Sequence, residues 1–198
     1  MVQGFDASQG VSKAQFEGLV KEKYEFFIAR VWRSIGACDP TGIQNIKNAH
    51  AAGMPRVDGY FFPCTKSNCA PAADQIETVL NKLKSEAVKI GTLWIDIEIH
   101  QWPANHAANR QFILDMIQQA ESMGQTVGIY SNYNNWQSIV GLEWTALSHY
   151  PLWWATYNGK ANFDDFKAFG GWNKPTIKQY QGTTNGPYGV SMDLNWHP

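Results

Sequence analysis

Two carboxylates and a histidine share the segment 92–100, "TLWIDIEIH", in which every acid is flanked by apolar residues. Charged side chains are almost never fully buried unless they are paired or have a function. Side chains alternate between the two faces of a strand, so Asp96, Glu98 and His100 would share one face with Trp94. The three isoleucines would share the other face and pack against helices. The segment therefore predicts a strand that directs two acids toward one site.

Carboxylates spaced in this way have a known chemical use. Two positions along a strand correspond to about 6.6 Å. Paired carboxyl groups at such separations hydrolyse glycosidic bonds, one protonating the leaving oxygen and the other acting on the sugar. The estimate falls between the ranges typical of retaining and of inverting enzymes, so both stereochemical outcomes stay open. Burial and a nearby like charge would raise the pKa of one acid and keep it protonated as a general acid.

The order of strand-like and helix-like segments along the chain predicts the fold that positions these acids. The first five of eight strand-like segments alternate strictly with segments of helical periodicity, whereas the later connections are short and rich in Gly, Asn and Pro. These eight segments are residues 2–8, 26–32, 57–63, 92–100, 126–132, 152–157, 176–182 and 191–196. The pattern predicts one α/β domain over residues 1–198, an irregular TIM-like (β/α) barrel of about eight strands with missing or shortened late helices. An open doubly wound sheet is the competing fold, but no Gly-rich phosphate loop follows the first strand.

In a parallel barrel the reacting groups gather at the carboxyl ends of the strands. Four acids are expected there: Asp6 from the first strand, Asp96 and Glu98 from the fourth, and Asp193 from the last. The first and last strands of a closed barrel are neighbours, so Asp6 and Asp193 should lie side by side.

Two other classes of function use similar residues. Asp96, Glu98 and His100, with Asp193 nearby, would suit a divalent metal for hydrolysis or deacetylation. Only His100 and His197 are available as nitrogen ligands, however, and a histidine at the end of a strand is more often a loop residue. In the second alternative, a non-catalytic carbohydrate-binding barrel, the aromatic residues bind and the acids only accept hydrogen bonds from sugar hydroxyls.

The amino-acid composition indicates which classes of binding partner suit this chain. The net charge is −1 and no Lys/Arg-rich run occurs, which argues against nucleic acid and anionic membrane as partners. No apolar run approaches the roughly 18 residues of a membrane span. The nine Trp, eight Tyr and ten Phe are unusually many, and those near strand ends offer flat faces for stacking on sugars.

Three cysteines bear on the compartment. Cys64 and Cys69 lie close together in "CTKSNC", so a local disulfide that leaves Cys38 unpaired is the preferred arrangement. A bridge from Cys38 to one of them is nearly as well supported, and a zinc site lacks a histidine at ligand spacing. The cysteines favour an oxidising compartment. The chain shows no signal peptide, so we expect either a cytosolic protein or one whose signal has been removed.

Five motifs in order, "GFDAS", "WIDIE", "GIYSN", "LWWATY" and "SMDLNW", resemble glycoside hydrolase family 25, the Ch-type lysozymes. The resemblance covers nearly the whole chain, and "YFFPC" is similar to the eukaryotic members. It implies an irregular barrel, without a cofactor, that cleaves the β-1,4 bond between N-acetylmuramic acid and N-acetylglucosamine in bacterial peptidoglycan. We also expect a secreted or lysosomal/phagosomal protein that acts as a monomer, with antibacterial defence, digestion and cell-wall remodelling all open as its role.

Carried over by position, the resemblance assigns eight site residues. Glu98 matches the general acid, and Asp96 matches the partner that steers the substrate's N-acetyl group as it attacks the anomeric carbon. Asp6 and Asp193 match the other acids of the site. The substrate-binding positions are Tyr60, Tyr130, Trp153 and Gln179. The family often has "W-Q-Y" where this chain has Lys178-Gln179-Tyr180, a departure next to one of these positions.

Overall fold

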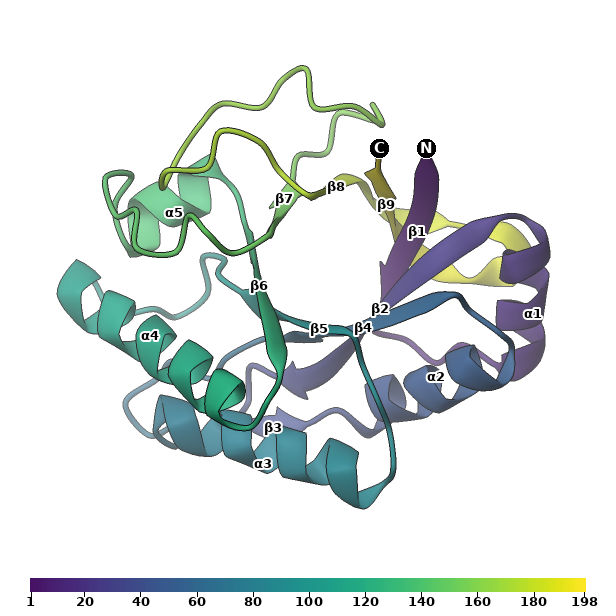
Figure 1. Cartoon of the computed structure of the whole chain (residues 1–198), viewed down its shortest axis with the longest axis horizontal. Coiled ribbons are helices and arrows are strands. Elements are labelled where there is room, and N and C mark those ends of the chain that lie inside the picture. Colours follow the sequence, from purple (N-terminus) through teal and green to yellow (C-terminus); the bar gives the residue numbers. More distant parts are fainter.

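The computed structural model describes residues 1–198 as nine strands and five α-helices arranged as a barrel (Figure 1). The strands are β1 (Val2–Ala7), β2 (Tyr24–Arg33), β3 (Ala37–Cys38), β4 (Arg56–Phe61), β5 (Thr92–Asp96), β6 (Thr126–Ser131), β7 (Leu152–Ala155), β8 (Ile177–Asn185) and β9 (Ser191–His197). All eight predicted strands are present, and the two-residue β3 is added as a hairpin partner of β2.

The helices cover only part of the barrel. They are α1 (Lys13–Lys21), α2 (Pro40–Ala51), α3 (Ala72–Ser85), α4 (His106–Ser122) and α5 (Tyr133–Ile139), with a short 3₁₀-helix, η1 (Pro187–Gly189), before β9. Figure 1 shows α1 to α4 following one side of the barrel, while loops cover the side beyond β7 and β8. The prediction of missing late helices is confirmed.

The barrel closes because β1 pairs with both β2 and β9. Strands β1, β2 and β4 to β8 pair with one another in parallel, but β9 is antiparallel to both β8 and β1, and the short β3 is antiparallel to β2. The expectation of an all-parallel barrel is therefore wrong for the last strand. Only a short connection of five residues separates β8 from β9. Such a connection suits an antiparallel hairpin, whereas a parallel crossover needs a dozen or more residues.

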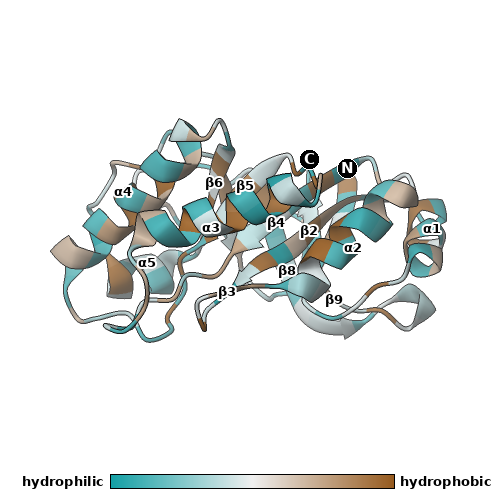
Figure 2. Ribbon diagram, turned by 90° about the horizontal axis from the view of Figure 1, so that it is seen from below, coloured by the Kyte–Doolittle hydropathy of each residue, from teal (hydrophilic) through white to brown (hydrophobic).

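Local sequence signals explain where the helices begin. Helix α1 starts with a capping box, in which Ser12 and Gln15 each bond to the other's backbone N–H. The side chains of Asp39, Asn105 and Asn132 cap α2, α4 and α5, each accepting a hydrogen bond from one backbone N–H of the first turn. Figure 2 shows hydrophilic and hydrophobic residues alternating along α2, α3 and α4, as expected for helices with one face on the barrel.

Two layers of apolar side chains hold the barrel. The larger layer lies between the strands and the helices, and includes Phe5, Ile95 and Ile117. The smaller one fills the barrel interior, and its members are Phe26, Ile28, Trp94, Tyr130, Trp153, Ala155 and Ile177. Glycines make room for the large rings: a Cβ at Gly128 would lie 2.4 Å from the ring of Trp94. The interior is therefore a packed core, and polar side chains gather at the carboxyl ends of its strands.

The cysteines pair as preferred from the sequence. Cys64 and Cys69 form a disulfide in the loop after β4, and Cys38 is a free, half-buried thiol. None of the helices combines the length and the apolarity needed to cross a membrane.

The contact between Gly128 and Trp94 gives a test of the interior packing. The Trp94 indole is fully buried and donates a hydrogen bond to Asp58, so a displacement of the ring would disturb both its packing and this hydrogen bond. We expect Gly128→Ala to lower the free energy of unfolding by about 1–3 kcal/mol, the usual cost of an overpacked core. Gly10→Ala is the matched control, because the nearest atom to its new Cβ would be 4.0 Å away. Urea denaturation of both variants measures the difference, and equal stabilities would contradict this packing.

Candidate active site

The segment that contains Asp96 and Glu98 follows the predicted alternation only as far as Glu98. Asp96 ends β5 and is buried, 3% exposed, while Ile95 and Ile97 are buried on the opposite face. Glu98 is half-buried in the loop beyond the strand. Ile99 was expected to pack against a helix but is 61% exposed, because the strand has already ended. The two acids therefore lie at different depths, Asp96 below and Glu98 nearer to solvent.

The other two acids meet across the closure of the barrel. Asp6 and Asp193 are direct partners in the antiparallel pairing of β1 with β9. Asp6 stands late in β1, whereas Asp193 is the third residue of β9. Because β9 is antiparallel, its beginning lies at the same end of the barrel as the carboxyl ends of the parallel strands. The prediction that Asp6 and Asp193 lie side by side is confirmed.

All eight predicted site residues line one pocket of about 190 Å³ at this end of the barrel. Its lining consists of Asp6, Tyr60, Asp96, Glu98, Tyr130, Trp153, Tyr157, Gln179 and Asp193. A second hollow of similar volume continues past Asp6 and Asp193 toward Ser8 and Gln9. Together the two hollows extend the site across the mouth of the barrel.

The four acids form two pairs, each with one deeply buried member. Burial raises the pKa of Asp96 well above its usual range, and the charge of Glu98 and a hydrogen bond with it raise the pKa further. Burial likewise raises the pKa of Asp6, helped by the charge of Asp193 and opposed by hydrogen bonds from Asn195 and Gln179. Each buried carboxyl group therefore holds its proton more readily than a free acid and can donate it toward its partner.

Gln179 is the polar centre of the site. Its Oε1 accepts hydrogen bonds from the hydroxyl groups of Tyr130 (2.6 Å) and Tyr157 (2.9 Å). Its Nε2 donates to Asp6 (2.8 Å) and to Asp193 (3.2 Å). Both ends of the amide are thus engaged within the protein, and the side chain is buried. The geometry favours a positioning role for Gln179, although the family resemblance assigns it to substrate binding.

Trp153 forms the floor below the acids. It is buried, and its ring centre lies 4.5 Å from that of Tyr130 and 6.1 Å from that of Tyr60. Its Nε1 donates to Asn195 Oδ1 (2.8 Å), and Asn195 Nδ2 donates to Asp6 (2.8 Å). Sequence reasoning missed Asn195, although the alternation of polar residues along "SMDLNW" places it on the same face as Asp193.

Tyr157 is the second residue that sequence reasoning missed. It lies two residues beyond β7, and it is 63% exposed at the edge of the pocket. Burial of its hydroxyl end raises the pKa of Tyr157 to about 12. Its position just past a strand end in "LWWATY" was the available signal. Of the aromatic rings that line the pocket, Tyr157 presents the largest exposed area for a sugar.

Lys178 anchors the loop that carries Tyr157. Its side chain faces away from the pocket, donates from Nζ to Asn158 Oδ1 (2.9 Å) and lies 4.9 Å from the ring centre of Trp154. Burial lowers the pKa of Lys178. Lys178, which departs from the "W-Q-Y" pattern, thus holds a loop in a place where regular barrels have a helix.

His100 lies outside the acidic pocket, as expected. It is exposed in the loop after β5, and its ring contacts Phe62. The structure contains no group of three or more His, Cys, Asp or Glu side chains placed to hold a metal ion.

A closed (β/α) barrel with carboxyl pairs and aromatic rings at the carboxyl ends of its strands is typical of barrel glycosidases. The comparisons with known proteins agree. The sequence family described as "Lysozyme-like protein 1" matches residues 1–180. Lysozyme-like protein 5 of Caenorhabditis elegans is 50% identical, over 98% of this chain and 91% of its own length. Probable GH family 25 lysozyme 4 of Dictyostelium discoideum is 39% identical, over 98% and 90% respectively.

The fold has close solved counterparts. The structure of a muramidase from Trichobolus zukalii superposes with a TM-score of 0.78 at 20% identity, covering 100% of this chain and 94% of that one. The chain belongs to glycoside hydrolase family 25, among its lysozyme-like members. The comparisons support neither the metal-dependent deacetylase nor the non-catalytic barrel.

The raised pKa of Asp6 predicts how stability depends on pH. An unfolded aspartate has a pKa of about 3.9, so between that value and the higher folded pKa the folded state binds more protons. The protonated Asp6 therefore adds to the free energy of unfolding. This stabilisation is fully present below the pKa of Asp6 in the unfolded chain, and it is lost as the pH rises through the pKa of Asp6 in the folded protein. Asp6→Asn keeps an acceptor for Gln179 and Asn195 but cannot ionise, so we expect a shallower loss of stability between pH 4 and pH 7.

Urea denaturation at several pH values measures this difference. The control is Asp164→Asn, which replaces an exposed aspartate far from the barrel interior. An unchanged pH dependence in Asp6→Asn would mean that Asp6 is ionised throughout this range.

Proposed function

We propose that this protein is a lysozyme that hydrolyses the β-1,4 bond between N-acetylmuramic acid and N-acetylglucosamine in bacterial peptidoglycan. The observation that carries the proposal is the convergence of Asp6, Asp96, Glu98 and Asp193 in one pocket with Gln179 and aromatic rings. The two relatives described above are named as a lysozyme-like protein and a probable lysozyme, which supports the same conclusion.

Glu98 is the proposed general acid. It is half-buried at the mouth, where a glycosidic oxygen can reach it, while Asp96 lies deeper. Glu98 gives its proton to the leaving oxygen of N-acetylglucosamine as the bond to the anomeric carbon of muramic acid breaks. In the second step its carboxylate takes a proton from the water that attacks the same carbon. The products are a new reducing end on muramic acid and a free hydroxyl group on glucosamine.

Asp96 is the proposed partner of the substrate's acetamide group. Asp96 lines the pocket next to Glu98 and takes part in no salt bridge, so its carboxyl group is available as an acceptor for the acetamide N–H of a bound sugar. The acetamide oxygen then attacks the anomeric carbon, and positive charge develops next to Asp96. One proton shared by Asp96 and Glu98 serves both tasks, because its transfer to Glu98 leaves Asp96 negatively charged.

The cellular location and the oligomeric state are also part of the proposal. The Cys64–Cys69 disulfide is typical of oxidising compartments, which supports action outside the cytosol, either secreted or in a lysosomal or phagosomal compartment. An antibacterial role would follow from such a location. We propose that the protein acts as a monomer without a metal or other cofactor, since all the acting groups named above come from one chain.

The decisive experiment is digestion of purified peptidoglycan followed by borohydride reduction and mass analysis of the fragments. We expect reduced ends on muramic acid alone, and the same rate with and without EDTA, since only carboxyl and amide groups act. Reduced ends on glucosamine, deacetylated sugar or loss of activity in EDTA would each contradict the proposal.

Glu98→Gln tests the assignment of the acid. Glutamine keeps the size of the side chain but cannot protonate the leaving oxygen, so the rate of wall hydrolysis should fall by about 10²–10⁴-fold. The control is Glu77→Gln, because Glu77 is exposed on α3. Thermal unfolding of both variants should match that of the unaltered protein. A Glu98→Gln protein that keeps most of its activity would refute this role.

A further inference from the structure

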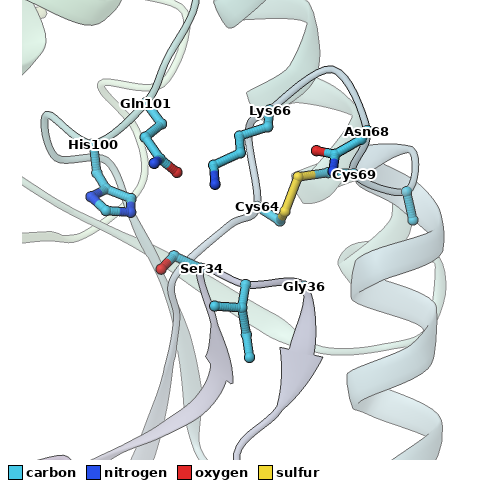
Figure 3. Close-up of a pocket in the computed structure, with 10 residues that line it drawn as sticks. Ser34, Gly36, Cys64, Lys66, Asn68, Cys69, His100 and Gln101 are labelled. Atoms are coloured by element: carbon cyan, nitrogen blue, oxygen red, sulfur yellow. A yellow bond between two sulfur atoms is a disulfide. The ribbon is translucent and has the colours of Figure 1, made fainter.

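A second pocket, which the sequence did not suggest, lies beside the catalytic one. It has a volume of about 460 Å³ and is formed by three loops, after β2 (residues 34–36), after β4 (64–70) and after β5 (100–101). Strands β2, β4 and β5 are neighbours in the barrel, so these loops meet at the same end as the active site. Figure 3 shows the side chains of Lys66, His100 and Gln101 directed into the same space, beside the Cys64–Cys69 disulfide.

Two chain segments lead from the catalytic pocket to this second pocket. Glu98 lines the first, and His100, two residues later, lines the second. Tyr60 likewise lines the first, and the chain continues through Phe62 to Cys64 in the second. The rings of Phe62 and His100 are in contact, with centres 5.2 Å apart, and join the two segments. A polymer bound at Glu98 can therefore also contact the second pocket, because only one or a few residues of each segment separate the two linings.

Buried contacts hold this pocket in shape. Gln75 is 1% exposed and spans the disulfide loop, since its Nε2 donates to the carbonyl oxygens of Cys64 (2.9 Å) and Ala70 (2.7 Å). Its Oε1 accepts from the backbone N–H of Cys64 and from Trp32 Nε1, both at 3.0 Å. The hydroxyl group of Thr65 donates to the carbonyl oxygen of His100, which ties the second loop to the third. These contacts fix the backbone of the loops that line the pocket.

The two pockets differ in charge. The catalytic pocket has four acids in its lining, whereas the second has no acid and one ammonium group, that of Lys66. Lys66 takes part in none of the salt bridges of the structure. Ser34, Asn68 and Gln101 add neutral hydrogen-bonding groups. An anionic part of a substrate is repelled by the first pocket and attracted by the second.

We propose that this second pocket binds a carboxylate of the peptide attached to muramic acid, with Lys66 as its charged partner. The inference rests on the proposed function, because peptidoglycan is a glycan whose muramic acid residues bear peptides with free carboxylates. Lys66 pairs with the carboxylate, and Gln101, whose side chain is directed into the same space, supplies an amide that can donate to it. The pocket makes the enzyme prefer wall that carries peptides over bare glycan.

The test compares Lys66→Gln with the unaltered protein on two substrates, intact peptidoglycan and glycan strands stripped of peptide by an amidase. An exposed charge pair contributes up to about 1 kcal/mol, which corresponds to roughly three- to fivefold in kcat/KM. We expect this loss on intact peptidoglycan and none on stripped glycan. Lys66→Arg should restore the preference, and the loss should shrink at high salt. Lys84→Gln, which removes an exposed lysine from the last turn of α3, is the matched control.

The outcomes separate this inference from the proposed function. If the unaltered protein cleaves neither substrate, the proposed function itself fails. If it cleaves both but Lys66→Gln loses activity equally on both, or on neither, the peptide site is refuted. Wall phosphate is the other anion to consider, so the intact substrate is also tested after hydrofluoric acid has removed phosphate polymers. A loss that disappears with the phosphate would overturn the assignment to a peptide carboxylate.

Discussion

The antiparallel pairing of β9 with both β1 and β8 is the constraint on which the site depends. This pairing closes the barrel and brings Asp193 opposite Asp6, although the two residues lie near opposite ends of the chain. It also sets Asn195 beside Asp6 and Gln179, so that both amides can donate to the same carboxyl oxygen. If β9 were absent, Asp6 would lose Asp193 and Asn195 and would face solvent at the edge of an open sheet.

The buried acids of the barrel differ in how their charge is balanced. Asp58 contacts Arg56 at 2.7 Å and also accepts from Trp94 and from the backbone of Thr92, so it is an ordinary structural ion pair. Asp6 and Asp96 are just as buried but take part in no salt bridge, and each faces another acid instead. Burial without a cation favours the protonated form. The mouth of the barrel thus keeps labile protons where reacting groups need them, at a cost in stability that a structural site would avoid.

Much of this arrangement was predictable from the sequence, because the spacing of apolar and polar residues along each segment shows whether it is a strand or a helix and which side chains share a face. Alternation along residues 92–98 gave the faces of Asp96 and Glu98, and strand order around a closed barrel gave the meeting of Asp6 with Asp193. The exposure of Ile99 was missed because hydropathy does not reveal where a strand ends. The direction of β9 was missed because period-2 alternation is the same for parallel and antiparallel strands. The hydrogen bonds of Gln179 join β8 to three other strands and a loop, and no local pattern contains them.

The pairing of β1 with β9 also fixes where the ends of the chain lie. Val2 pairs with His197 at the end of the barrel opposite the site, and Figure 1 shows the two termini side by side. A short linker could therefore join them, and new termini opened in a distant surface loop would leave every strand of the barrel in its present order. The protein is for this reason suited to circular permutation, and a domain fused at either end would extend away from the acidic pocket.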